Sequence, residues 1–243
     1  MLSRRIIGIA CFLAGLEMWV LLNEMLAPGT VRLPLAGIPI LPLAAVPWLI
    51  GVWTCSAVAF TLDWQRRASG VVLLAAMAYV LLMDERTYSN HLYLLCLLVL
   101  VLTWADDVTA RRLMRVQLSI VYGFAALAKV NLSFLSGAVL LAYGRTVLPE
   151  SWLRVEVLAT LALLAVLSEA FLAVAFWSDR LRPWAWAVGL GLHIGSAALI
   201  HDGRLGVAIF GLAMVGLYTA FTHRDLAHLP PATREDAARS AER

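Results

Sequence analysis

Residues 154–177 read RVEVLATLALLAVLSEAFLAVAFW, and this stretch decides the class of the fold. An α-helix needs about 20 consecutive, mostly apolar residues to cross the hydrocarbon core of a bilayer. The stretch has this length, and after its first turn it contains a single ionisable residue, Glu169. It therefore predicts a transmembrane helix.

Seven other apolar runs accompany it, at residues 5–26, 40–62, 68–84, 91–105, 113–135, 183–200 and 205–222. Of the 243 residues, 62% are hydrophobic and only 14% charged, whereas soluble domains carry about 25% charged residues. This composition excludes an ordinary soluble enzyme. Because every run is too long for a barrel strand, we expect an all-α fold, a polytopic integral membrane helical bundle with about eight transmembrane helices. Residues 1–222 then form a single domain, and the polar residues 223–243 are expected to be a disordered tail.

The arginines predict the orientation of this bundle. The chain has nineteen basic residues, and Lys129 is its single lysine. With the N-terminus in the cytoplasm, eight spans place thirteen arginines inside and five outside, as the positive-inside rule requires. Both termini are then cytoplasmic. The arginines are scattered between apolar runs, so we expect no nucleic-acid partner. The inside set is Arg4, Arg5, Arg66, Arg67, Arg111, Arg112, Arg115, Arg180, Arg182, Arg224, Arg234, Arg239 and Arg243, and the outside set is Arg32, Arg86, Arg145, Arg154 and Arg204.

Ionisable side chains inside hydrocarbon are costly and usually mark a function or a polar cavity. At 1.5 Å per residue, the predicted spans place four such residues in the outer half of the membrane and two deeper. The outer group is Glu24, His91, Lys129 and His193, and the deeper group is Glu17 and Glu169. We expect no metal site, because neither the cysteines nor the histidines have the spacing of metal ligands.

Lys129 lies on a polar stripe of the fifth run. The stripe consists of Arg115, Ser119, Tyr122, Ala126, Lys129 and Ser133, which follow one another at steps of three or four residues and so share one helical face. Desolvation favours a neutral lysine amine, which is a competent general base. The alternative is a lysine that pairs with a nearby carboxylate and carries out no chemistry. His193 likewise either donates to a ligand or is satisfied by a neighbouring helix.

Two sequence blocks resemble a known family. Residues 84–94 fit Asp-x5-Asn-His-x-Tyr-Leu, with Asn90 and His91 at its centre, a signature of vitamin K-dependent gamma-carboxylases. Arg115-x-Gln117, Tyr122, Lys129 and Gly137 fit the second block of that family in register. His193 on the next-to-last run is a third, weaker match. The resemblance covers residues 40–222 and identifies the chain as similar to the bacterial HTTM (horizontally transferred transmembrane) proteins.

The resemblance implies a chemistry for these residues. Lys129 matches the base that deprotonates vitamin K hydroquinone, O2 then adds, and the resulting strong base removes a γ-proton from a glutamyl side chain that CO2 captures. Asn90 and His91 match residues that position oxygenated intermediates. We accordingly expect a gamma-carboxylase-like enzyme with Lys129, His91 and Asn90 as catalytic residues. Its cofactor would be reduced vitamin K or menaquinone, contacted by the set Tyr88, Tyr122, His193 and Ser196.

The chain also departs from that family. From its short polar tail we expect no large lumenal C-terminal domain. The paired lysine of that family is Ala128-Lys129 here, Phe134 replaces a tryptophan and Ser196 replaces an asparagine. A peptide substrate or a partner subunit is therefore expected to complete the carboxylase reaction. The expected location is a bacterial inner membrane, with the site open to the periplasmic half. The alternative function is a non-enzymatic membrane module that binds a lipid or quinone, or that assists the maturation of, or immunity to, an exported peptide. A transporter is less favoured, because no inverted repeat is seen.

Overall fold

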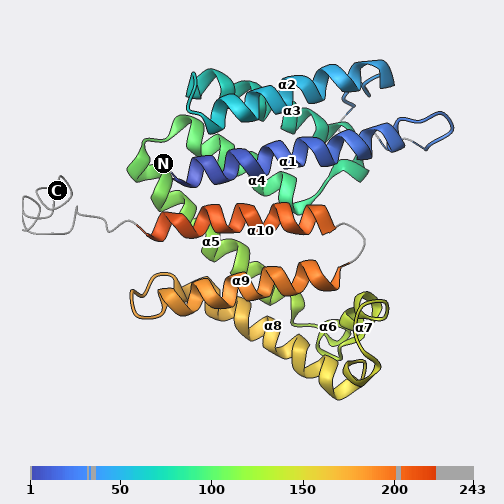
Figure 1. Cartoon of the computed structure of the whole chain (residues 1–243), viewed down its shortest axis with the longest axis vertical. Helices are drawn as coiled ribbons and strands as arrows, with labels where there is room; N and C mark the ends of the chain where they lie inside the picture. The colour runs from blue at the N-terminus through green and yellow to red at the C-terminus, as the bar shows by residue number, and fades with distance from the viewer. Residues whose placement is uncertain (1, 32, 34–36, 201–203, 223–243) are drawn as a thin grey trace, which may run out of the picture.

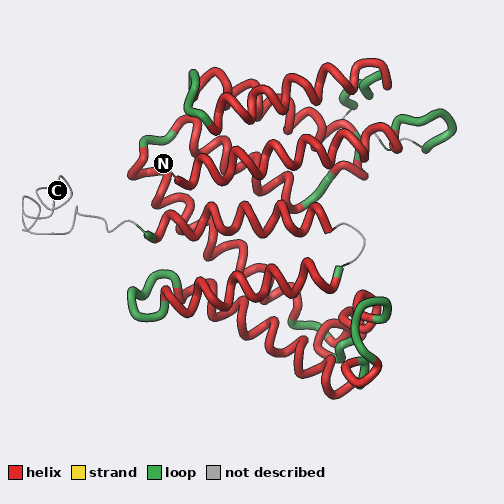
Figure 2. Tube along the Cα trace, in the orientation of Figure 1, coloured by secondary structure: helices red, strands yellow, loops and turns green. Residues whose placement is uncertain are grey.

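The computed structural model describes residues 2–31, 33, 37–200 and 204–222. The described part is all-α, as predicted, with ten α-helices and four 3-10 helices (Figures 1 and 2). The α-helices are α1 Leu2–Met25, α2 Val46–Thr61, α3 Arg66–Met83, α4 Asn90–Trp104, α5 Asp107–Lys129, α6 Leu132–Leu135, α7 Ala138–Gly144, α8 Val155–Ala175, α9 Arg182–Leu199 and α10 Arg204–Tyr218. The 3-10 helices are η1 Leu43–Ala45, η2 Glu85–Thr87, η3 Glu150–Trp152 and η4 Thr219–Phe221.

Each of the eight apolar runs corresponds to one of the longer helices. Four helical segments are long and apolar enough to cross a membrane by length and composition, namely Leu2–Met25, Leu43–Thr61, Arg66–Met83 and Val155–Ala175. The shorter segments Asn90–Trp104 and Leu205–Phe221 are also apolar. A total of eight spans and the cytoplasmic placement of the termini stay predictions. The predicted tail, residues 223–243, lies outside the described residues.

The long helices run back and forth between two ends of the molecule. The N-terminus, the α2–α3, α4–α5 and α8–α9 turns and the end of α10 all lie at the end marked N in Figure 1. Helix α1 packs between α2 and α10, and α5 packs against α8, which crosses the bundle obliquely. The main core forms where α1, α2, α3, α4 and α10 meet. There the buried Trp53 side chain donates to the carbonyl oxygen of Cys11 at 2.8 Å, which joins α2 to α1.

Helix α5 corrects one predicted boundary. The expected run was 113–135, whereas the helix spans Asp107–Lys129. It begins early because the Asp106 side chain accepts hydrogen bonds from the backbone N–H groups of Val108 and Thr109, which makes Asp106 an N-cap. It ends at Lys129 because the Asn131 side chain caps the short helix α6 instead. Lys129 is thus the last residue of its helix and does not lie in the interior of a span that continues to residue 135.

Helices α6 and α7 form a segment between α5 and α8 that the apolar runs do not predict. Gly137 joins them in the left-handed backbone conformation, with φ of 79°. A Cβ atom at this position would lie 2.6 Å from Cβ of Leu158, so the turn packs directly on α8. This tight turn explains why the second sequence block ends in a glycine. It also places the start of α8 beyond the end of α5.

Candidate functional site

Two cavities meet at the end of α5. One, of about 650 Å³, is mostly apolar and lies between α5, α6, α7, α8 and α9. The other, of about 560 Å³, is more polar and lies between α1, α4, α5, α8, α9 and α10. Lys129, Glu169 and Ser196 line both cavities. Together with Leu192 and Ile200, which also line both, these residues form a wall between a mostly apolar cavity and a cavity with more polar side chains, which is named the polar cavity here.

Lys129 and Glu169 form an ion pair in this wall. The Nζ atom of Lys129 lies 2.7 and 2.8 Å from the two carboxylate oxygens of Glu169. The lysine side chain is 30% exposed and the glutamate side chain 9%. The Nζ atom also lies 5.7 Å from the ring centroid of Phe134, within the range of a cation–π contact. The lysine thus reaches both cavities as half of a bidentate pair.

A second pair, between the His91 ring and the Glu17 carboxylate, lines the polar cavity. The Nε2 atom of His91 lies 2.8 Å from a carboxylate oxygen of Glu17. When Nε2 carries the proton and donates it to Glu17, Nδ1 of the ring is left as a hydrogen-bond acceptor. A carboxylate that orients a histidine in this way is the usual support of a histidine general base. His91 therefore has a partner suited to proton transfer.

Gly206 of α10 keeps space open around this pair. A Cβ atom at this position would lie 2.8 Å from Oε1 of Glu17 and 3.3 Å from Nδ1 of His91. Gly206 itself lines the polar cavity. The missing side chain therefore lets the His91–Glu17 pair approach the backbone of α10 without blocking the free ring nitrogen.

A hydrogen-bonded group of rings continues from the cavity into the core. His193 lines the polar cavity, and its Nε2 atom lies 3.0 Å from the hydroxyl oxygen of Tyr122. The Tyr122 hydroxyl also forms a short hydrogen bond with the hydroxyl of Tyr218 on α10. The Tyr218 ring stacks on Phe176, with centroids 4.6 Å apart. This group fixes the orientation of His193 relative to α5 and α10.

The turn between α3 and α4 positions Asn90 and His91. The Asp84 side chain is completely buried and accepts hydrogen bonds from Arg86 and from the backbone N–H of Leu33. The Arg86 side chain holds the pKa of Asp84 at about 2, below its usual value of 3.8. The aspartate of the first sequence block therefore ties the turn between α3 and α4 to the loop after α1.

The structure brings most of the predicted site residues to one place. The polar cavity is lined by Asn90, His91, Lys129, His193 and Ser196. Tyr122 lies behind it and reaches it through His193. Tyr88 lines neither cavity. Its side chain is 55% exposed, and its ring lies 6.3 Å from that of Tyr93.

Glu17 and Glu169, which the sequence predicts to lie deeper in the membrane than His91 and Lys129, each lie beside one of these two residues in the structure. Because α8 starts beyond the α6–α7 segment, Glu169 lies beside the end of α5. Because α4 begins at Asn90, His91 lies in its first turn, beside Glu17 of α1. The position of both glutamates within apolar runs indicated that they belong to a site. Their partners could not be predicted, because they depend on how far the helices are shifted along one another.

One protein-family model matches part of the chain. Residues 24–112 match the model of the HTTM domain, which includes Asn90 and His91 and ends before Lys129. No curated protein and no solved structure matches the chain. Within the described residues, no group of three or more His, Cys, Asp or Glu side chains is placed to hold a metal ion. The chain thus contains four helical segments that are long and apolar enough to cross a membrane, and its residues 24–112 are similar to the HTTM domain.

Proposed function

We propose that this protein is a membrane enzyme that binds a lipid-soluble hydroquinone, such as reduced menaquinone or vitamin K, and removes a proton from its hydroxyl group. One observation carries the proposal. The Lys129–Glu169 pair stands in a wall shared by an apolar and a polar cavity. A hydroquinone has the matching shape, with an apolar ring and tail and a hydroxyl group that can donate a proton.

The residues present fit such a molecule. The apolar cavity is lined by Phe134, Leu140 and Leu164, which suit a ring and an isoprenoid tail. The hydroxyl group would meet Lys129 and Glu169 at the wall. His193 and Ser196 offer hydrogen-bond partners on the polar side.

The Lys129–Glu169 and His91–Glu17 pairs would hold the proton that is removed from the hydroquinone. When the shared proton of the Lys129–Glu169 pair lies on the carboxyl group, the lysine amine is free to accept the hydroquinone proton, and the pair becomes an ammonium beside a neutral carboxylic acid. His91, oriented by Glu17, is a second acceptor, which can pass a proton between the cavity and the glutamate. Asn90, which lines the same cavity, supplies an amide that can hold an oxygen atom in place.

A bound hydroquinone would supply reducing power toward O2, and the resemblance to gamma-carboxylases suggests that this drives the carboxylation of an acidic carbon with CO2. A peptide, a protein or a partner subunit would then provide the glutamyl side chain. We place the site in the outer half of the inner membrane, because the α5–α6 end lies opposite the arginine-rich N-terminal end of the bundle.

A second candidate is a non-enzymatic module that binds a lipid or a quinone, or that assists the maturation of or immunity to an exported peptide. The bidentate geometry of Lys129 favours it, because a lysine that meets both oxygens of a carboxylate is also a stable structural pair. In that case Arg should replace Lys129 without loss, since arginine forms bidentate carboxylate pairs well. A lysine that must act as a base does not tolerate this change, because arginine stays protonated.

The test uses the purified protein in liposomes with reduced menaquinone and O2, and measures the epoxide formed and the binding of the quinol. We expect epoxide from the wild type and at least a hundredfold loss for Lys129→Ala, Lys129→Arg and Glu169→Gln, in line with the usual contribution of a general base. Glu24→Gln is the matched control, because Glu24 is exposed and lines neither cavity.

The outcomes separate the two candidates. If the wild type and all variants bind the quinol but form no epoxide, and cells that carry Lys129→Arg function normally, the binding module is established and the enzyme is refuted. Equal epoxide formation by the wild type and Lys129→Ala would remove the lysine from the role of base.

A further inference from the structure

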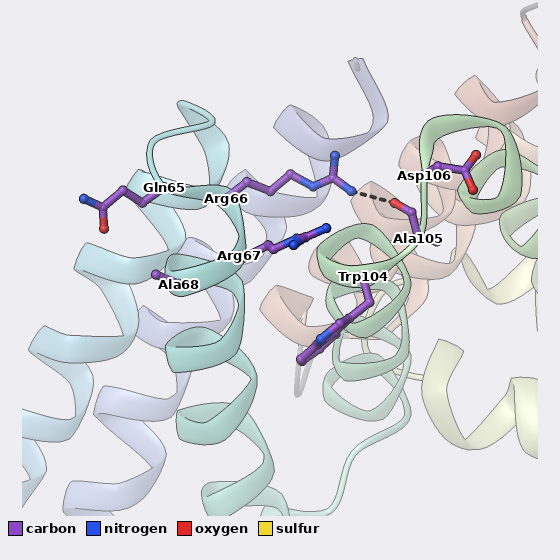
Figure 3. A pocket seen from close by; sticks show the side chains of 7 residues that line it. All are labelled: Gln65, Arg66, Arg67, Ala68, Trp104, Ala105 and Asp106. Atoms are coloured by element: carbon purple, nitrogen blue, oxygen red, sulfur yellow. Dashed lines mark hydrogen bonds between the residues drawn. The ribbon is translucent and has the colours of Figure 1, made fainter.

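A third cavity, of about 740 Å³, lies at the N-terminal end of the bundle, far along the helices from the site above. It forms between the first turn of α3 and the turn that joins α4 to α5. Figure 3 shows Arg66 and Arg67 extending from α3 toward Trp104 and Ala105, while Gln65 points away from them. The cavity therefore combines two guanidinium groups with an indole ring.

The two arginines have different surroundings. Arg66 donates from Nε to the carbonyl oxygen of Leu102 at 2.8 Å and from Nη2 to that of Ala105 at 2.6 Å, and its Nη1 lies 3.9 Å from a carboxylate oxygen of Asp107. It thus ties α3 to the end of α4. Arg67 is exposed, and it forms no hydrogen bond or ion pair within the part of the chain that the structure describes. Its guanidinium is the cation that the cavity offers to a ligand.

The carboxylate that lines the cavity is already engaged. One oxygen of Asp106 accepts from the backbone N–H groups of Val108 and Thr109, and the other accepts from the Thr109 hydroxyl at 2.6 Å. The Thr109 hydrogen bonds hold the pKa of Asp106 at about 2. Asp106 therefore stays turned toward the start of α5 and does not pair with Arg67.

The location points to a lipid as the ligand. The cavity lies at the ends of two candidate membrane spans, Leu43–Thr61 and Arg66–Met83. Two tryptophans mark this level, Trp64 and Trp104, whose side chains are both exposed. Tryptophan is enriched where a helix passes through the headgroup region of a bilayer. Basic pockets between the ends of membrane helices bind anionic headgroups on the cytoplasmic side.

We propose that this cavity binds the phosphate of an anionic phospholipid headgroup, with Arg67 as the main contact and the Trp104 indole beside it. A guanidinium offers two parallel N–H donors to a phosphate. The indole N–H is a further donor, and its ring suits the boundary between headgroups and acyl chains. This site is independent of the proposed enzymatic function, because it shares no residue with the two cavities at Lys129.

The test titrates phosphatidylglycerol into the purified full-length protein in a neutral detergent and follows bound lipid by native mass spectrometry. Phosphatidylcholine and inorganic phosphate are titrated in parallel. We expect Arg67→Gln to weaken phosphatidylglycerol binding about fivefold, because the hydrogen-bonded contact between its guanidinium and the phosphate is lost. Arg112→Gln is the matched control, because Arg112 is an exposed arginine at the same end that lies outside the cavity and has no partner among the described residues.

The control decides how the result is interpreted. A fivefold loss in Arg67→Gln with a change below twofold in Arg112→Gln supports the site, provided that phosphatidylcholine binding does not respond. Equal losses in the two variants would show general surface attraction and overturn the proposal. It is also overturned if inorganic phosphate competes with the lipid in an Arg67-dependent way at the same concentration, because the ligand is then a free anion.

Discussion

Replacing Glu169 by glutamine keeps the shape of the side chain and removes the charge that faces Lys129. At 2.7 Å and an effective dielectric constant of about 20, the attraction between the two charges is about 6 kcal/mol. The cost of removing both groups from water offsets much of this. Breaking a fully buried pair costs about 3–5 kcal/mol. Since the Lys129 side chain is 30% exposed, we expect Glu169→Gln to lower the free energy of unfolding by about 2–3 kcal/mol.

A double-mutant cycle with Lys129→Met measures the pair itself. We expect each single variant and the double variant to lose a similar amount, so that the coupling energy is about 2 kcal/mol. The assay is equilibrium unfolding of the purified protein in mixed micelles with increasing SDS, followed by circular dichroism. Glu24→Gln, on an exposed position, should change the free energy of unfolding by less than about 0.5 kcal/mol. If the losses of the two single variants simply add, the ion pair contributes nothing to the fold, and its role in the wall is refuted.

Three other predictions follow from single contacts. Asp84→Asn should destabilise the fold by about 2 kcal/mol, because hydrogen bonds to a buried carboxylate are lost. In the wild type the folded-state pKa of Asp84 is lowered to about 2, so its contribution is complete above its ordinary value of 3.8 and disappears as the pH falls toward 2, which thermal unfolding at stepped pH would detect. Gly137→Ala should lower the melting temperature, because φ is positive and a Cβ would overlap α8. Gly51→Ala, with no atom within 4 Å of its new Cβ, should not. Tyr218→Phe should cost about 1 kcal/mol, measured by unfolding in SDS, by removing the hydrogen bond to Tyr122, and an unchanged stability would show that this bond contributes nothing.

The helices were predictable because burial in lipid or in protein demands long apolar runs. Seven of the eight predicted runs begin and end within a few residues of the observed helices. The exception is α5, whose first turns carry Asp107, Arg111 and Arg112 and so do not count as apolar. The Asp106 cap shows where that helix begins, and a hydropathy pattern does not detect a cap. The α6–α7 segment was missed because both helices are short and depend on the turn at Gly137.

The polar stripe on α5 was predictable for a similar reason. Its residues recur every three or four positions, and the polar side chains of Arg115, Ser119, Tyr122 and Lys129 form hydrogen bonds with other helices. Ser119 donates to the carbonyl oxygen of Ala173 and accepts from the Trp177 indole, and these bonds join α5 to the end of α8. Ser133 is the exception, since α5 ends before it and its side chain is exposed. Which partner each residue meets depends on helix offset and tilt, and these arise from tertiary packing.

The division of the site between two parts of the chain limits what the family match explains. His91 and Asn90 lie within the HTTM match, at the start of α4. Lys129, Glu169 and His193 lie after it, on α5, α8 and α9. Glu17, the partner of His91, lies before the match begins at residue 24. The polar cavity therefore exists only where helices from inside and outside the matched segment pack together. A function that depends on this cavity belongs to the whole bundle, and the pairing of Lys129 with Glu169 decides whether that function includes proton transfer.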